Sequence, residues 1–161
     1  MKRFNRRIYH TVGDFWRDAR FPLRNRAQLR QAMKGDLISF AFRERLMLAV
    51  TAVNGCRYCS YFHAKEALKA GLAEEELRQL LVGLVDDAPA EELQALLYAQ
   101  HWAETDGQPD PTAQQQLVQT YGLDRAEAIE TVLRMIRIGN LLGNTGDYWL
   151  YRLSRGAFGG S

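Results

Sequence analysis

The spacing of apolar residues most constrains the fold of this 161-residue chain. Val, Ile and aromatic residues nowhere alternate at period two for long, so β-strands are not expected. Prolines at positions 22, 89, 109 and 111 and several Gly-containing turns divide the chain into helical lengths. The sequence therefore predicts an all-α fold of packed helical hairpins without an internal repeat.

Six helices are expected from residue 37 onward, and most have a recognisable start or stop signal. They cover residues 37–53, 56–70, 73–82, 89–104, 112–120 and 124–153. Asn54-Gly55 ends the first helix, which is apolar nearly all round from Leu46 onward, and Gly71 ends the second. Three glutamates in the first turn of the third helix complement its dipole.

Length and composition indicate one domain with a substantial hydrophobic core, since 47% of the residues are hydrophobic and 25% are charged. Within it we expect a basic N-terminal arm with short helices over residues 1–36, a helical core over 37–153 and a flexible tail over 154–161. No apolar run is long enough for a membrane span. The N-terminus lacks the apolar segment of a secretory signal, so a cytoplasmic location is expected.

Charge is distributed unevenly along the chain. Residues 1–45 carry twelve Lys/Arg against four Asp/Glu, and residues 46–161 carry nine against fifteen. A basic front end suits an anionic partner, a membrane surface or RNA, but it also suits an acidic neighbouring subunit or plain solvent. No nucleic-acid module accompanies it, which favours the subunit and solvent interpretations. A weak amphipathic stripe of Ile8, Val12, Phe15 and Trp16 suits a docking arm better than a membrane-surface helix.

The only two cysteines, Cys56 and Cys59, stand three positions apart, and His63 follows four positions later. In a helix, these three side chains form a single stripe. A disulfide between Cys56 and Cys59 closes too small a loop to be a useful structural staple. The pattern therefore favours dithiol–disulfide chemistry.

Helix geometry adds Glu44 to this group. Glu44 lies about 15 Å before the Asn54-Gly55 turn and His63 about 12 Å after it, at 1.5 Å per residue, so the two side chains can meet across an antiparallel hairpin. The carboxylate fixes the imidazole tautomer and makes His63 a better base for Cys59. Cys56 lies in the first turn of its helix, where the helix dipole and unpaired N–H groups stabilise a thiolate. Which sulfur attacks first stays open on these grounds.

The pattern Glu-x11-Cys-x2-Cys-x3-His, carried by Glu44, Cys56, Cys59 and His63, resembles the alkylhydroperoxidase D / carboxymuconolactone decarboxylase superfamily. Within this superfamily, the chain resembles the cysteine-containing, peroxidase-like branch more than the decarboxylases. The resemblance covers residues 37–83, including Asn-Gly before the first cysteine and Ala-Gly-Leu-Ala-Glu-Glu-Glu after the second helix. Residues 139–147, GNLLGNTGD, are similar to the terminal helix of some uncharacterised relatives.

The resemblance implies an all-helical fold that assembles into trimers or hexamers and needs no cofactor or metal. It implies a peroxidase that reduces a hydroperoxide and is regenerated by a dithiol protein or small dithiol. Carried over by position, Cys59 is peroxidatic, Cys56 resolving, His63 the base and Glu44 its partner. Tyr58 stands where the well-known enzyme has a histidine that joins the relay. A tyrosine is a poor base at neutral pH but donates a hydrogen bond, which puts the efficiency of the peroxidase in doubt.

Other interpretations remain open. A non-catalytic redox sensor or interaction protein uses the same two thiols, and a lactone decarboxylase ranks last because such enzymes generally lack the cysteine pair. A zinc site of the four motif residues is awkward, because three ligands would come from one short helix. Asn140, Asn144 and Asp147 form a polar stripe that suits an active site or a subunit interface, with a structural role slightly favoured.

Overall fold

The computed structural model describes residues 4–159, which form eight α-helices and, within that range, no β-strand. The helices are α1 (Val12–Arg24), α2 (Arg26–Lys34), α3 (Phe40–Asn54), α4 (Arg57–Lys69), α5 (Glu74–Leu81), α6 (Ala90–Glu104), α7 (Pro111–Tyr121) and α8 (Leu123–Leu153). The all-α prediction is confirmed. The six helices expected after residue 36 are all present, with ends that differ by no more than three residues from those expected.

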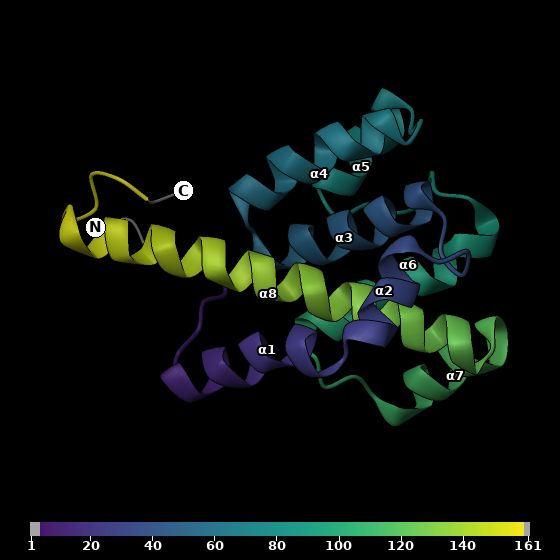
Figure 1. The fold of residues 1–161 in the computed structure, drawn as a ribbon. Coiled ribbons are helices and arrows are strands. Elements are labelled where there is room, and N and C mark those ends of the chain that lie inside the picture. The colour runs from purple at the N-terminus through teal and green to yellow at the C-terminus, as the bar shows by residue number, and fades with distance from the viewer. Residues whose placement is uncertain (1–3, 160–161) are drawn as a thin grey trace.

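Helix α3 forms the centre of the structure. It packs against α8, α6 and α4, and Figure 1 shows the long α8 running across the molecule beside it. Every side chain from Leu46 to Val50 is buried, as the continuous apolar run predicts. Because α3 is central, its Glu44 is buried at the contact with α4.

The turn between α3 and α4 sets the geometry of the cysteine motif. The Oγ atom of Ser39 accepts a hydrogen bond from the backbone N–H of Phe42 and caps the start of α3. Gly55 ends α3 in the left-handed conformation at φ 74°, which a glycine adopts without strain. Cys56 is then the N-cap of α4 rather than a residue of its first turn. The chain reverses within these few residues, so α3 and α4 form a hairpin.

The N-terminal region forms α1 and α2, which both pack against α8. Pro22 is expected to divide the chain but lies inside α1. It does so two residues before the helix ends, where its missing N–H removes a bond only in the last turn. The segment before α1 runs along the C-terminal half of α8, and the N–H of Tyr9 donates to Oγ1 of Thr145 at 3.0 Å.

The last described residues fold back onto α8. The backbone N–H of Gly156 donates to the carbonyl of Tyr151 at 2.8 Å, and Arg6 donates to the carbonyl of Gly159. The first and last described segments therefore meet, as Figure 1 shows. Residues 160 and 161 of the expected tail lie outside the described residues. None of the helices within residues 4–159 has the length and apolar character needed to cross a membrane.

Candidate active site

Glu44 and His63 meet across the α3–α4 hairpin, as the heights along the two helices predict. The Nδ1 atom of His63 lies 2.7 Å from Oε2 of Glu44. Glu44 is 3% exposed, and Arg43 lies 3.7 Å from its other carboxylate oxygen. A carboxylate on Nδ1 orients the ring and leaves Nε2 as the nitrogen available for proton exchange.

The two cysteines are free thiols in direct contact. Their Sγ atoms are 2.7 Å apart, and the backbone N–H of Cys59 also donates to Sγ of Cys56 at 3.3 Å. The sulfur of Cys56 therefore occupies the capping position of α4, where N–H groups converge. Cys56 is 0% exposed, whereas Cys59 is partly exposed. Of the two residues, only Cys59 has exposed surface.

The two thiols differ in acidity. A hydrogen bond from Cys59, helped by the backbone N–H groups of Cys59 and Tyr58, outweighs burial and lowers the pKa of Cys56 to about 6. The same hydrogen bond, together with burial, raises the pKa of Cys59 well above the usual thiol range, against a hydrogen bond from Asn140. Between the two sulfurs, the thiolate is therefore favoured on Cys56 and the proton on Cys59.

Tyr58 belongs to a second cluster, centred on Asp147 of α8. Its hydroxyl donates to Oδ1 of Asp147 at 2.8 Å, and Arg57 donates to the same oxygen at 2.8 Å. Arg6, from the N-terminal segment, pairs with Oδ2. Asp147 is 1% exposed. Burial acts to raise the pKa of Asp147, but hydrogen bonds from Tyr58, Arg6 and Arg57 outweigh it and keep that pKa below the usual range.

The polar stripe of α8 lies against the cysteine hairpin. Oδ1 of Asn140 accepts from Nδ2 of Asn54 at 3.1 Å, and Nδ2 of Asn144 donates to the Asn54 carbonyl at 2.8 Å. Both asparagines are completely buried. A Cβ atom on Gly143 would lie 2.9 Å from Sγ of Cys56, so α8 approaches the sulfur as closely as a glycine permits. These residues position the α3–α4 turn and the Cys56 sulfur from behind.

Residues 23–101 match the family model described as the carboxymuconolactone decarboxylase family. They run from the end of α1 to the last turn of α6 and contain Glu44, both cysteines and His63. The chain is similar to this family over these 79 residues, just under half of its length. The searches of curated proteins and of solved structures returned no significant match.

The matched residues 23–101 contain both thiols and the carboxylate–imidazole pair. The residues that contact this group from α8 and from the N-terminal segment lie outside the match. Asn140, Gly143 and Asp147 all follow the matched residues, and Arg6 precedes them. The alkyl part of Arg6 also packs against Gly55. The sequence did not predict that Arg6 contacts Asp147 beside the cysteine turn. The available signal was the excess of arginines before residue 45 together with the acidic second half of the chain.

Of the five site residues predicted from the sequence, four form two contacting pairs, and Tyr58 lies in a separate cluster. Glu44 contacts His63 and Cys56 contacts Cys59, but within residues 4–159 no hydrogen bond links His63 to either sulfur. Tyr58 contacts Asp147 instead of the Glu44–His63 pair. In the same range, no cluster of three or more His, Cys, Asp or Glu side chains has the arrangement of a metal site.

Proposed function

We propose that the protein is a thiol-dependent hydroperoxidase that uses Cys56 and Cys59 as a redox pair. The observation that carries this proposal is the 2.7 Å contact between the sulfurs of the buried Cys56 and the partly exposed Cys59, one helical turn before the Glu44–His63 pair. Dithiol chemistry needs two adjacent sulfurs, one of them ionised at neutral pH, and a base that can exchange a proton.

We assign the attack on the peroxide to Cys59, because Cys56 has no exposed surface. Transfer of the shared proton to Cys56 leaves the thiolate on Cys59. Its sulfur bonds to one peroxide oxygen, the O–O bond breaks, and the alkoxide leaves with a proton that His63 relays from solvent. Cys59 is thereby oxidised to a sulfenic acid while the hydroperoxide is reduced to an alcohol.

The second step closes the disulfide. The Cys56 thiol attacks the Cys59 sulfur, the S–S bond forms, and the hydroxyl of the sulfenic acid leaves as water with the Cys56 proton. An external dithiol then reduces this disulfide through thiol–disulfide exchange and becomes a disulfide itself. The short distance between the two sulfurs supports rapid closure. Tyr58 has a supporting role here, because it helps to hold Arg57 and Asp147 beside Cys56.

The remaining parts of the proposal follow the family pattern. We infer a hydroperoxide substrate, a dithiol protein or small dithiol as reductant, and assembly into trimers or hexamers. We place the enzyme in the cytoplasm, where reductants that regenerate a dithiol are available. We infer one domain with a basic N-terminal arm.

A redox-sensing role is the second candidate, and the contact of Arg6 with Gly55 and Asp147 favours it. Oxidation of Cys56 removes its negative charge beside this cluster, which changes what holds the N-terminal segment in place. A sensor would change its assembly or partner binding on oxidation while turning over negligible peroxide. A decarboxylase role has less support, since it gives the two sulfurs no task.

Cysteine variants provide the decisive experiment. Wild type, Cys59→Ser, Cys56→Ser and the double variant are treated with one equivalent of cumene hydroperoxide, and intact mass and free thiols are measured. We expect a disulfide in wild type, a trapped sulfenic acid in Cys56→Ser, and no oxidation of Cys59→Ser on the same timescale. With excess dithiothreitol, wild type should consume peroxide continuously. Unchanged turnover in Cys59→Ser would refute the proposal, and oxidation without turnover would favour the sensor.

A further inference from the structure

A second candidate site lies between α1 and α8, separate from the cysteines. It is a hollow of about 450 Å³, within the range of small-molecule pockets. Four arginines and two aromatic residues form most of its lining: Arg17, Arg20, Arg24, Arg134, Trp16 and Phe21. Among residues 4–159, no Asp or Glu lines this hollow. The hollow is therefore a concentrated positive region on a chain whose net charge is only +2.

Three of the arginines follow one face of α1. Arg17, Arg20 and Arg24 stand at i, i+3 and i+7, so they form one stripe about 10 Å long. Arg134 approaches from α8, and its guanidinium carbon lies 4.4 Å from the centroid of the Phe21 ring. This cation–π contact keeps the Arg134 guanidinium at the edge of the hollow without neutralising its charge.

Most of these guanidinium groups have no carboxylate partner. Within residues 4–159, no Asp or Glu carboxylate oxygen lies within 4.0 Å of a guanidinium nitrogen of Arg20, Arg24 or Arg134. Arg17 pairs with Asp14 on its own helix. An arginine can donate two parallel hydrogen bonds to an oxyanion, so three unpaired groups around one hollow are available for such a ligand.

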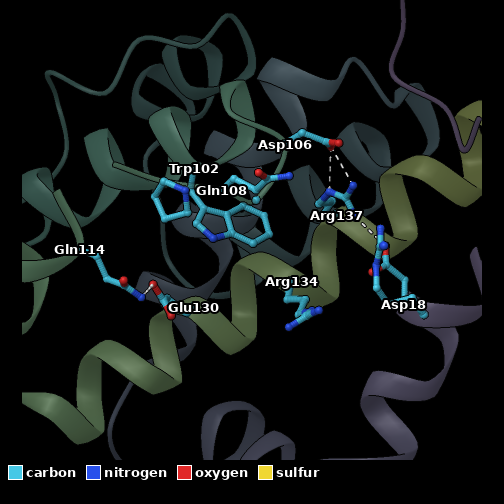
Figure 2. A pocket seen from close by; sticks show the side chains of 11 residues that line it. Asp18, Trp102, Asp106, Gln108, Gln114, Glu130, Arg134 and Arg137 are labelled. Atoms are coloured by element: carbon cyan, nitrogen blue, oxygen red, sulfur yellow. Dashed lines mark hydrogen bonds and ion pairs between the residues drawn. The ribbon is translucent and has the colours of Figure 1, made fainter. Parts of the chain in front are cut away.

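Arg137, one turn further along α8 than Arg134, provides the contrast. It donates to Asp18 at 2.5 Å and to Asp106 at 2.7 Å, so its charge is already paired with two carboxylates of the protein. Figure 2 shows these bonds as dashed lines and shows none at Arg134. The pocket in Figure 2, of about 380 Å³, adjoins the hollow and shares Arg17 and Arg134 with it. Arg134 therefore borders both spaces.

We propose that this hollow binds a small molecule carrying phosphate groups and a planar ring, of the nucleoside diphosphate class. The arginines supply donors for two neighbouring phosphates, and Trp16, which is 54% exposed, supplies a face for the ring. The size of the stripe favours a small ligand over RNA, because a 10 Å stripe beside a concave space accommodates only a few phosphates. The proposal does not depend on the peroxidase proposal.

The test measures binding of ADP, inorganic phosphate and a twelve-nucleotide single-stranded RNA by calorimetry at 0.1 M NaCl. The site variant is Arg20→Gln/Arg24→Gln. The matched control is Arg26→Gln/Arg30→Gln, which removes two exposed arginines from α2 outside the hollow. We expect one ADP site per chain, at least tenfold weaker in the site variant and in Arg134→Gln, and within twofold of wild type in the control. Trp16→Ala should weaken ADP several-fold and leave inorganic phosphate unchanged.

Three results would overturn the proposal. One is the absence of ADP and phosphate binding at millimolar concentration. Another is an equal loss in the site variant and in the control, which would mean diffuse charge rather than a site. The third is tighter binding of RNA than of ADP with a steep salt dependence, which would assign the basic region to nucleic acid. Thermal unfolding of each variant checks that the fold is kept, and unchanged peroxide turnover separates this site from the cysteines.

Discussion

The imidazole of His63 lies 2.7 Å from the carboxylate of Glu44, although the two residues belong to different helices. Glu44→Gln preserves the size of the side chain but removes its charge, so the ring loses the partner that fixes its orientation. We expect peroxide turnover to fall about tenfold or more. Glu66→Gln, which changes a glutamate on α4 that pairs only with the exposed Lys69, should keep wild-type turnover. Equal activity in both variants would remove Glu44 from the mechanism.

The thiolate at Cys56 should be visible by its ultraviolet absorbance. Its pKa is lowered to about 6, so one thiolate per chain should be present above that pH and should disappear as the pH falls through it. Cys59→Ala removes the hydrogen-bond donor and should move the midpoint clearly upward, whereas Cys59→Ser keeps a hydroxyl donor and should move it less. Absence of thiolate absorbance in wild type at pH 7.5 would contradict this assignment.

Asp147 should contribute to stability through its three donors. Asp147→Asn leaves Arg6 without an anionic partner in a buried cluster and should lower the free energy of unfolding by about 3 kcal/mol at pH 7. Because the pKa of Asp147 is held below its usual range in the folded protein, this contribution is present above the usual carboxyl pKa. It is lost as the pH falls through the depressed value. Urea unfolding at pH 7 and pH 3 measures it, and the exposed Asp87→Asn is the control.

The glycines of α8 should differ in their tolerance of alanine. A Cβ atom on Gly143 would lie 2.9 Å from Sγ of Cys56, whereas within residues 4–159 a Cβ on Gly139 or Gly146 would meet nothing within 4 Å outside the adjacent backbone of α8. We expect Gly143→Ala to destabilise the protein by about 1–2 kcal/mol and to slow disulfide formation. Gly139→Ala and Gly146→Ala should be neutral or more stable by up to about 1 kcal/mol, because alanine favours a helix. If all three variants behaved alike, the close approach of α8 to the sulfur would have no energetic consequence.

Local patterns in the sequence were sufficient to predict the helices and the Glu44–His63 contact. Apolar spacing, Gly55 and Gly71 act through neighbouring residues, so their effects can be inferred without knowing the rest of the fold. The same holds for a hairpin of two consecutive helices, where equal distances from one turn bring Glu44 and His63 to the same height. The exact start of α4 differed, because Cys56 caps the helix instead of beginning it.

The tertiary structure decided which surfaces surround the motif. Asp147 meets Arg6 and Tyr58 only because α8 and the N-terminal segment pack on the same side of the α3–α4 turn. Contacts between residues 141 positions apart depend on how all the helices pack, and no local pattern encodes that. The sequence alone determined that two thiols and a Glu–His pair are the candidates for the proposed dithiol chemistry. Only the fold decided that Cys56 is completely buried with a lowered pKa and that Cys59 keeps some exposed surface, because burial and converging hydrogen bonds are properties of the packed structure.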